Sequence, residues 1–172
     1  MFKYIRDLHD LNILIYTVNA LAARMDSAKI VTLLLMISFF RGGLSRCDIG
    51  WVNENQSCYY FSRFSTNFYT ALSFCKSVGG KLIEIDSRFE WNMIKRHVQG
   101  RRFPDFYIGL TDLFSEGDWQ KATTLGRQTF LQWGNGQPDN AGNNQHCVQV
   151  YVSAMKFDDL WCHYDRHFIC EK

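Results

Sequence analysis

The chain has 172 residues, of which 47% are hydrophobic and 21% charged, enough for one buried core with an appendage. The formal net charge is +2, and the whole excess lies before Arg46, because the sequence from Arg46 onward has 14 basic and 14 acidic residues. No basic stripe suited to phosphate groups occurs, so we expect no nucleic-acid partner.

Residues 1–45 have the features of an N-terminal leader sequence. A lysine precedes the apolar run 30–40, and small residues lead up to Ser45, as in a secretory signal peptide. The run is shorter than the roughly 20 residues that a spanning helix needs, so we expect no stable membrane span. We predict cleavage after Ser45, with Met25 as an alternative start, and a secreted, extracellular domain over residues 46–172. A signal-anchor that holds the domain on a membrane is the alternative.

The cysteines are even in number and all lie in the second part of the chain. Such a set is typical of three disulfides formed in an oxidising compartment, and the sequence alone leaves fifteen pairings open. No Cys-x-x-Cys pair occurs, which disfavours a cysteine zinc site. The residues are Cys47, Cys58, Cys75, Cys147, Cys162 and Cys170.

The first part of the domain predicts two strands and two helices. Residues 58–64 have the aromatic density of a strand. Residues 67–78 place apolar side chains on one helical face, with Asn67 as the cap and Gly79-Gly80 as the stop. Residues 81–85 alternate as a short strand. Ser87 and Glu90 then resemble a capping box that opens a second helix, ending near Gln99.

The second part predicts strands around a long loop region. Residues 106–110 form a compact apolar strand, and residues 147–152 and 166–170 alternate as closing strands. Residues 111–145 are rich in Gly, Asn, Asp and Gln, and a loop of that length in a compact domain is usually functional or disordered. The predicted fold class is α+β, with two helices and short antiparallel strands.

Several motifs in a fixed order carry a family resemblance. The chain contains "CYYF", "GGKLIEIDSRFEW", "YIGL", "GQPDN", "FDD" and "WC", followed by "FIC". Over residues 47–172 this order resembles the C-type lectin-like domain, most of all the small single-domain secreted lectins of invertebrates. The resemblance implies disulfides that pair Cys75 with Cys170, Cys147 with Cys162, and Cys47 with Cys58.

The resemblance also implies one calcium ion that binds a sugar. Calcium takes six to eight oxygen ligands, largely from carboxylates and amides. The family's ligand positions fall on two residues that flank a proline, one before a cysteine, and an adjacent pair on a later strand. The peptide before that proline, Pro138, is normally cis. The ligands carried over are Gln137, Asp139, Gln145, Asp158 and Asp159.

Two of these positions depart from the family pattern. Gln145 stands where glutamate is usual, and Asp158 stands where asparagine is usual, so three aspartates still supply three negative charges. "QPD" implies galactose-type ligands, but both ligand pairs here run amide first and carboxylate second. We therefore expect relaxed selectivity that also admits mannose and glucose. An auxiliary calcium site is expected to be weak or missing, because His146 and Asn140 are uncharged at its positions.

Other interpretations of these residues remain open. The Gln137–Asn140 stretch has the composition of a simple turn. His163, Asp165 and His167 alternate and could form a metal or catalytic trio, although exposed positions of an edge strand are the simpler interpretation. Asn55 begins a glycosylation sequon, which makes a secreted chain a glycoprotein.

Together these observations predict a lectin rather than an enzyme. No nucleophile elbow, phosphate loop or zinc-protease helix occurs in the sequence. We expect calcium-dependent binding of glycans with terminal hexoses, in innate recognition. Two alternatives are a calcium-independent lectin-like domain with a protein-binding or biomineral-matrix role, and a hydrolase built on the face from His163 to His167.

Overall fold

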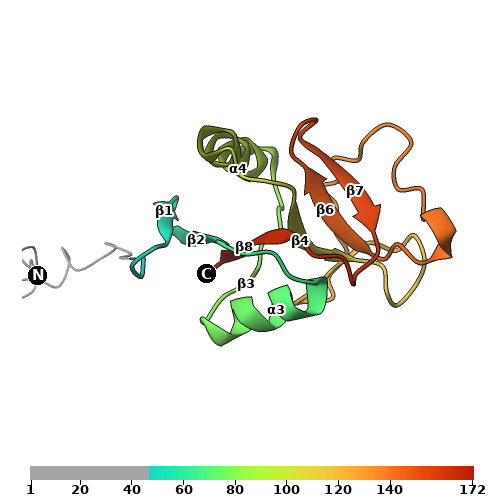
Figure 1. The fold of residues 1–172 in the computed structure, drawn as a ribbon, viewed down its shortest axis with the longest axis horizontal. Helices are drawn as coiled ribbons and strands as arrows, with labels where there is room; N and C mark the ends of the chain where they lie inside the picture. The colour runs from blue at the N-terminus through green and yellow to red at the C-terminus, as the bar shows by residue number, and fades with distance from the viewer. Residues whose placement is uncertain (1–46) are drawn as a thin grey trace, which may run out of the picture. The chain divides into compact units, whose positions relative to one another are not determined.

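The computed structural model describes residues 47–172 (Figure 1). The expected leader, with its signal peptide, its cleavage after Ser45 and the alternative start at Met25, lies outside the described residues. The helices are α3 (Phe68–Ser77) and α4 (Arg88–Arg101), and a short 3-10 helix, η1, covers Ala141–Asn143. The strands are β1 (Val52–Glu54), β2 (Ser57–Phe61), β3 (Lys81–Leu82), β4 (Phe106–Thr111), β5 (Gln120–Lys121), β6 (Cys147–Tyr151), β7 (Lys156–Leu160) and β8 (His167–Glu171).

The strands form a sheet in the order β1-β2-β8-β4-β6-β7, with β3 also paired to β8 and β5 to β4. Neighbouring strands run antiparallel except β4 and β8, which are parallel, with Phe106 opposite His167. This pair differs from the expected antiparallel pattern because β5, β6 and β7 intervene along the chain, so no hairpin turn fixes its direction. The result is an α+β fold with a mixed sheet.

Local sequence signals explain where both helices begin. The side chain of Asn67 accepts the backbone N–H of Thr70 at 3.0 Å, as an N-cap does. Ser87 accepts the N–H of Glu90 at 3.2 Å, and the Glu90 carboxylate accepts the N–H of Asp86 at 3.0 Å. The predicted capping box is therefore present, with its return bond one residue earlier than the usual partner.

The two helices pack into separate parts of the core, and Figure 1 shows them on opposite sides of the central strands. Buried residues of α4 contribute to one cluster with β4 and β6, and those of α3 contribute to another with β8. The helical members are Trp91, Met93, Ile94 and Val98 from α4, and Phe68, Ala71 and Cys75 from α3.

The strand predicted over residues 81–85 is shorter than expected. Only Lys81–Leu82 pairs regularly, because the chain then passes between two strands: the N–H of Ile83 bonds to Ile169 O at 2.9 Å, and Gly109 N–H bonds to Ile83 O at 2.6 Å. A Cβ on Gly109 would lie 2.7 Å from Leu82 O, so only glycine allows this close approach.

Three disulfides brace the domain, and no described cysteine is free. Cys47–Cys58 closes the first hairpin, Cys75–Cys170 joins α3 to β8, and Cys147–Cys162 joins the start of β6 to the turn after β7. The pairing agrees with the one that the resemblance implies. The chain between β5 and β6, coloured yellow to orange in Figure 1, extends beyond β6 and β7, away from β1.

Candidate functional site

A cis peptide shapes the loop that carries the first expected ligands. The Gln137–Pro138 bond is cis, as the resemblance implies. Asn140 follows with φ of 42°, in the left-handed region that asparagine tolerates better than most residues. These two backbone features lie on either side of Asp139, directly before η1.

Asp159 on β7 fixes this loop in place. Its carboxylate accepts the backbone N–H of Asp139 at 3.1 Å and that of Asn140 at 2.8 Å. The residue is 1% exposed, so these charge-assisted bonds form where water does not compete. Asp159 is thus the anchor between β7 and the proline loop.

Gln145 closes the loop from its other end. Its Oε1 accepts the N–H of Ala141 at 2.6 Å, and Asp139 Oδ1 accepts the same N–H at 3.2 Å. Its own N–H is accepted by the Asn140 side chain at 2.9 Å. Gln145 is 7% exposed and Asp139 is exposed, and side-chain oxygens of both residues accept the same N–H.

Gln137 and Asp158 line one cavity of about 300 Å³ together with Tyr151 and Lys156. The Oε1 atom of Gln137 is buried and has no hydrogen-bond partner in the protein. The Oδ2 atom of Asp158 accepts from Gln149 Nε2 at 2.7 Å, and Gln149 in turn accepts from Arg166. A buried amide oxygen without a hydrogen-bond partner is costly, so the Oε1 atom of Gln137 is suited to bind a cation or a hydrogen-bond donor.

Burial raises the pKa of the Asp158 carboxyl above its ordinary value. The hydrogen bond from Gln149 and the charge of Arg166 oppose the rise, whereas the charges of Asp159 and Asp139 add to it. The Asp158 carboxylate is therefore repelled by the charges of both other aspartates, and a cation bound beside it would offset that repulsion.

The structure thus connects all five expected residues. Asp159 accepts the backbone N–H of Asp139, and the side chains of Asp139 and Gln145 both accept the N–H of Ala141. The charges of Asp159 and Asp139 help to raise the pKa of Asp158. Gln137 lines the same cavity as Asp158. The donor set consists only of carboxylate and amide oxygens, including one unpartnered oxygen, so it fits calcium better than a softer metal.

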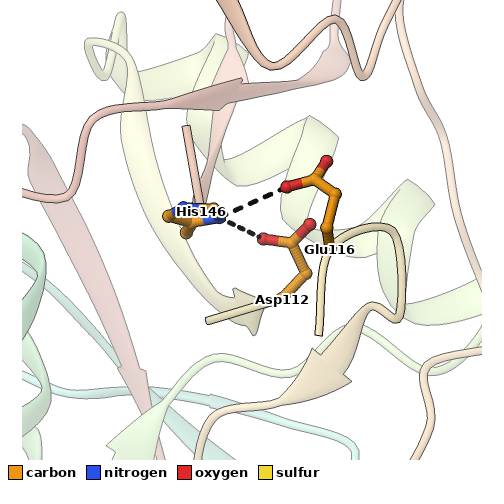
Figure 2. Close-up of side chains that lie close together, drawn as sticks. All are labelled: Asp112, Glu116 and His146. Carbon is orange, nitrogen blue, oxygen red and sulfur yellow. Dashed lines mark hydrogen bonds and ion pairs between the residues drawn. The ribbon is translucent and has the colours of Figure 1, made fainter. Parts of the chain in front are cut away.

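A tighter group lies nearby, and sequence analysis missed two of its members. Figure 2 shows Asp112, Glu116 and His146, whose ligand atoms lie within 4.8 Å of one another, the only such group of three His, Cys or acidic residues over residues 47–172. The sequence places His146 only as an uncharged residue at the auxiliary calcium position. The signal for the other two is "TDLFSEG", which begins at the last residue of β4 and places two acidic residues four apart.

The trio of His163, Asp165 and His167 does not form a site. His163 and Asp165 lie in the turn before β8, and β8 begins only at His167. The His167 ring contacts Ser62 Oγ at 3.2 Å and packs edge-on against Phe103, among core residues. The interpretation of these residues as alternate positions on a strand is wrong, because the turn that follows Cys162 interrupts it.

Residues 64–172 match the family described as Lectin C-type domain. The chain belongs to the C-type lectin family. The hepatic lectin of Gallus gallus is 35% identical over 123 residues, which cover 71% of this chain and 58% of that protein. Perlucin of Haliotis laevigata is 32% identical over 130 residues, covering 73% of this chain and 83% of perlucin. The lectin chain thus spans little more than half of one relative and most of the other.

Solved C-type lectin structures share the fold. The mouse scavenger receptor C-type lectin carbohydrate-recognition domain is 34% identical, with a TM-score of 0.69, over 74% of this chain and 98% of that one. A calcium-independent type II antifreeze protein is 26% identical, with a TM-score of 0.66, over 74% and 94%. Within residues 47–172, neither helix of this lectin domain has the length and apolar character needed to cross a bilayer.

Proposed function

We propose that this C-type lectin domain is a secreted, calcium-dependent receptor for terminal hexoses. The observation that carries the proposal is the buried, unpartnered Oε1 of Gln137, a residue that lines one cavity with Asp158, whose pKa the charges of Asp159 and Asp139 help to raise. A divalent cation bound there would supply a ligand for that oxygen and offset the repulsion between the carboxylates. Gln137, Asp139, Gln145, Asp158 and Asp159 are the proposed ligands.

The same side chains would orient the sugar. When bound, calcium supplies open coordination positions for two vicinal hydroxyls. Each amide NH₂ can donate to a hydroxyl oxygen, and each carboxylate can accept a hydroxyl proton. The Gln137–Asp139 and Gln145–Asp158 pairs both place an amide before a carboxylate. Each pair would therefore offer the sugar one donor and one acceptor in the same order. That symmetry supports acceptance of galactose, mannose and glucose.

A chromatographic test separates the parts of this proposal. The oxidised domain is passed over immobilised galactose and immobilised mannose with calcium, and again with a chelator. Retention on both sugars that is lost on chelation supports the proposal. Elution by free galactose while mannose and glucose stay inert would contradict the relaxed selectivity but leave the calcium site standing.

One observation favours a second function, a lectin-like domain that works without calcium. Both Asp159 oxygens and the Gln145 Oε1 already accept backbone N–H groups, so the loop closes on its own hydrogen bonds. Such a domain would serve a protein-binding or mineral-matrix role. Retention on neither sugar, together with no calcium uptake by calorimetry, would favour it.

Physiological use would require clustering. A single site of this kind holds a monosaccharide weakly, and several domains on one glycan surface would raise the avidity without any new contact. We propose innate recognition of glycans as the setting. Binding of an oligomerised form, but not of the monomer, to glycan-coated particles would support that role.

A further inference from the structure

We propose that the cavity lined by residues 134–137 and the β6–β7 hairpin selects hexoses with an anionic substituent, a sulfate or a carboxylate, which Lys156 binds. The inference rests on the proposed function, because the proposed calcium ligands must first hold the sugar. The cavity volume of about 300 Å³ lies at the lower end of the range for small-molecule sites. Among the described residues that line it, Lys156 is the one basic side chain.

The strand register places Lys156 at a defined distance from a proposed calcium ligand. β6 and β7 are antiparallel, with Tyr151 opposite Lys156 and Gln149 opposite Asp158. Side chains two residues apart on a strand point to the same face and are separated by about 7 Å along it. Lys156 and Asp158 therefore share one face of the hairpin, with Tyr151 beside Lys156. This spacing is comparable to the width of a hexose ring, so a sugar held at Asp158 would present its far substituent to Lys156.

Backbone hydrogen bonds hold the other wall of the cavity. The N–H of Gly134 donates to Phe157 O at 2.9 Å, and the N–H of Phe157 donates to Gln132 O at 2.8 Å. The N–H of Gln137 donates to Gly134 O at 3.1 Å, which ties the proline loop to the same segment. A Cβ on Gly134 would lie 3.6 Å from Gln137 Cγ and 3.7 Å from Lys156 Cβ. The separation between Gln137 and Lys156 is therefore set by paired backbone.

The side chains of Lys156 and Tyr151 are open to a ligand. Over residues 47–172, the Lys156 ammonium takes part in no ion pair and no hydrogen bond. Tyr151 is 49% exposed, so its ring can pack against a sugar face while its hydroxyl donates or accepts a hydrogen bond. An ammonium group binds sulfate or carboxylate oxygens through charge-assisted hydrogen bonds. The simple alternative is that Lys156 only protects β7, at one end of the sheet order, from pairing with another chain.

The test is a competition between neutral and anionic forms of one sugar. The oxidised chain is bound to immobilised galactose in millimolar calcium at low ionic strength, and is eluted with galactose, galactose 6-sulfate or galacturonate. We expect at least one anionic sugar to compete about five-fold better than galactose, the factor that an exposed ion pair can supply. A preference for only one of the two identifies the anion. The preference should fall at high salt, which screens exposed charges.

Variants locate the origin of the preference. Lys156→Gln should bring the ratio of anionic to neutral competition to about one, and Lys156→Glu should invert it, because the new carboxylate repels the anion. The matched control is Lys76→Gln, which removes an exposed lysine of α3 outside the cavity and should keep the five-fold ratio.

Two outcomes would overturn this proposal alone. Equal competition by all three sugars, or a preference that survives Lys156→Gln, would refute the role of Lys156 and leave the proposed lectin function standing. The absence of calcium-dependent retention on both galactose and mannose would overturn the two proposals together.

Discussion

The Asp159 carboxylate on β7 accepts the backbone N–H of Asp139, 20 residues earlier in the chain, at 3.1 Å. A second bond, from Asn140 N–H at 2.8 Å, uses the other oxygen of the same carboxylate. The loop that follows the cis proline is therefore tied directly to a strand of the sheet. The first prediction tests this double role as a loop anchor and a proposed calcium ligand.

Asp159→Asn should abolish calcium binding and also destabilise the calcium-free domain. An asparagine keeps one acceptor but turns an amide NH₂ toward a backbone N–H, so the free energy of unfolding should fall by about 1–3 kcal/mol. Calorimetry with calcium and urea denaturation in a chelator measure the two effects separately. A variant that is as stable as the parent would show that the two N–H bonds contribute little.

Gln145→Glu should raise calcium affinity by about ten-fold, equivalent to about 1.4 kcal/mol, because a carboxylate replaces an amide among the ligands. The Glu oxygen can still accept the N–H of Ala141. The matched control is Asn143→Asp, which adds a charge to the same loop at an exposed position of positive φ that aspartate tolerates. An equal gain in both variants would indicate a general field effect instead of direct coordination.

Removal of the Cys147–Cys162 bridge by a double substitution to alanine should cost about 3 kcal/mol of unfolding free energy. The bridge lies two residues from Gln145 and three from Asp159, so calcium affinity should fall with it. Removal of Cys47–Cys58 is the control, since that bridge closes the first hairpin. It should lower stability and leave calcium affinity unchanged, as measured by denaturation and calorimetry.

Glu171→Gln should stabilise the domain near neutral pH. Burial raises the pKa of the Glu171 carboxyl above its ordinary value, and the charges of Glu90, Glu84 and Asp86 raise it further against the opposing charge of Lys81. The stability that the protonated group contributes is present below its unfolded pKa and lost as pH rises through the folded pKa. Melting temperatures of parent and variant should therefore differ near neutral pH and converge in acid.

Lys81 does not lose its main partner in that variant. Its ammonium lies 2.9 Å from Glu84 and 3.7 Å from Glu171, so the closer ion pair remains. A lower melting temperature for Glu171→Gln at neutral pH would mean that the longer pair with Lys81 outweighs the cost of burying the carboxylate.

Asn55 should carry a glycan when the chain passes through a secretory pathway. The residue is exposed in the turn between β1 and β2, with φ of 49°, and exposed loops are where such acceptors are modified. Digestion with a glycosidase should reduce the apparent mass, and Asn55→Gln should abolish the shift. An unmodified chain recovered from the medium of secreting cells would contradict glycosylation of Asn55.

Much of the local structure followed from the sequence. Asn67 and Ser87 each accept the N–H three residues on, as their capping patterns predicted, because such bonds depend on adjacent residues alone. The adjacent aspartates 158 and 159 and the Gln-Pro-Asp stretch follow instead from the order of motifs that resembles the family. The strand at residues 81–85 was misjudged, since its hydrogen bonds after Leu82 go to two different strands that the alternation does not reveal.

Sequence alone therefore determined the helices with their caps and the even set of cysteines, and it supplied the oxygen-bearing side chains that we propose as ligands. Only the tertiary structure decided the parallel contact of β4 with β8, the unpartnered oxygen of Gln137, and the meeting of Asp112 with His146, 34 residues later. The physical reason is the distance along the chain between the residues that interact. Caps and turns are determined by neighbours along the chain. The surroundings of a buried side chain depend instead on which distant strands pair, and the packing of the whole core determines that pairing.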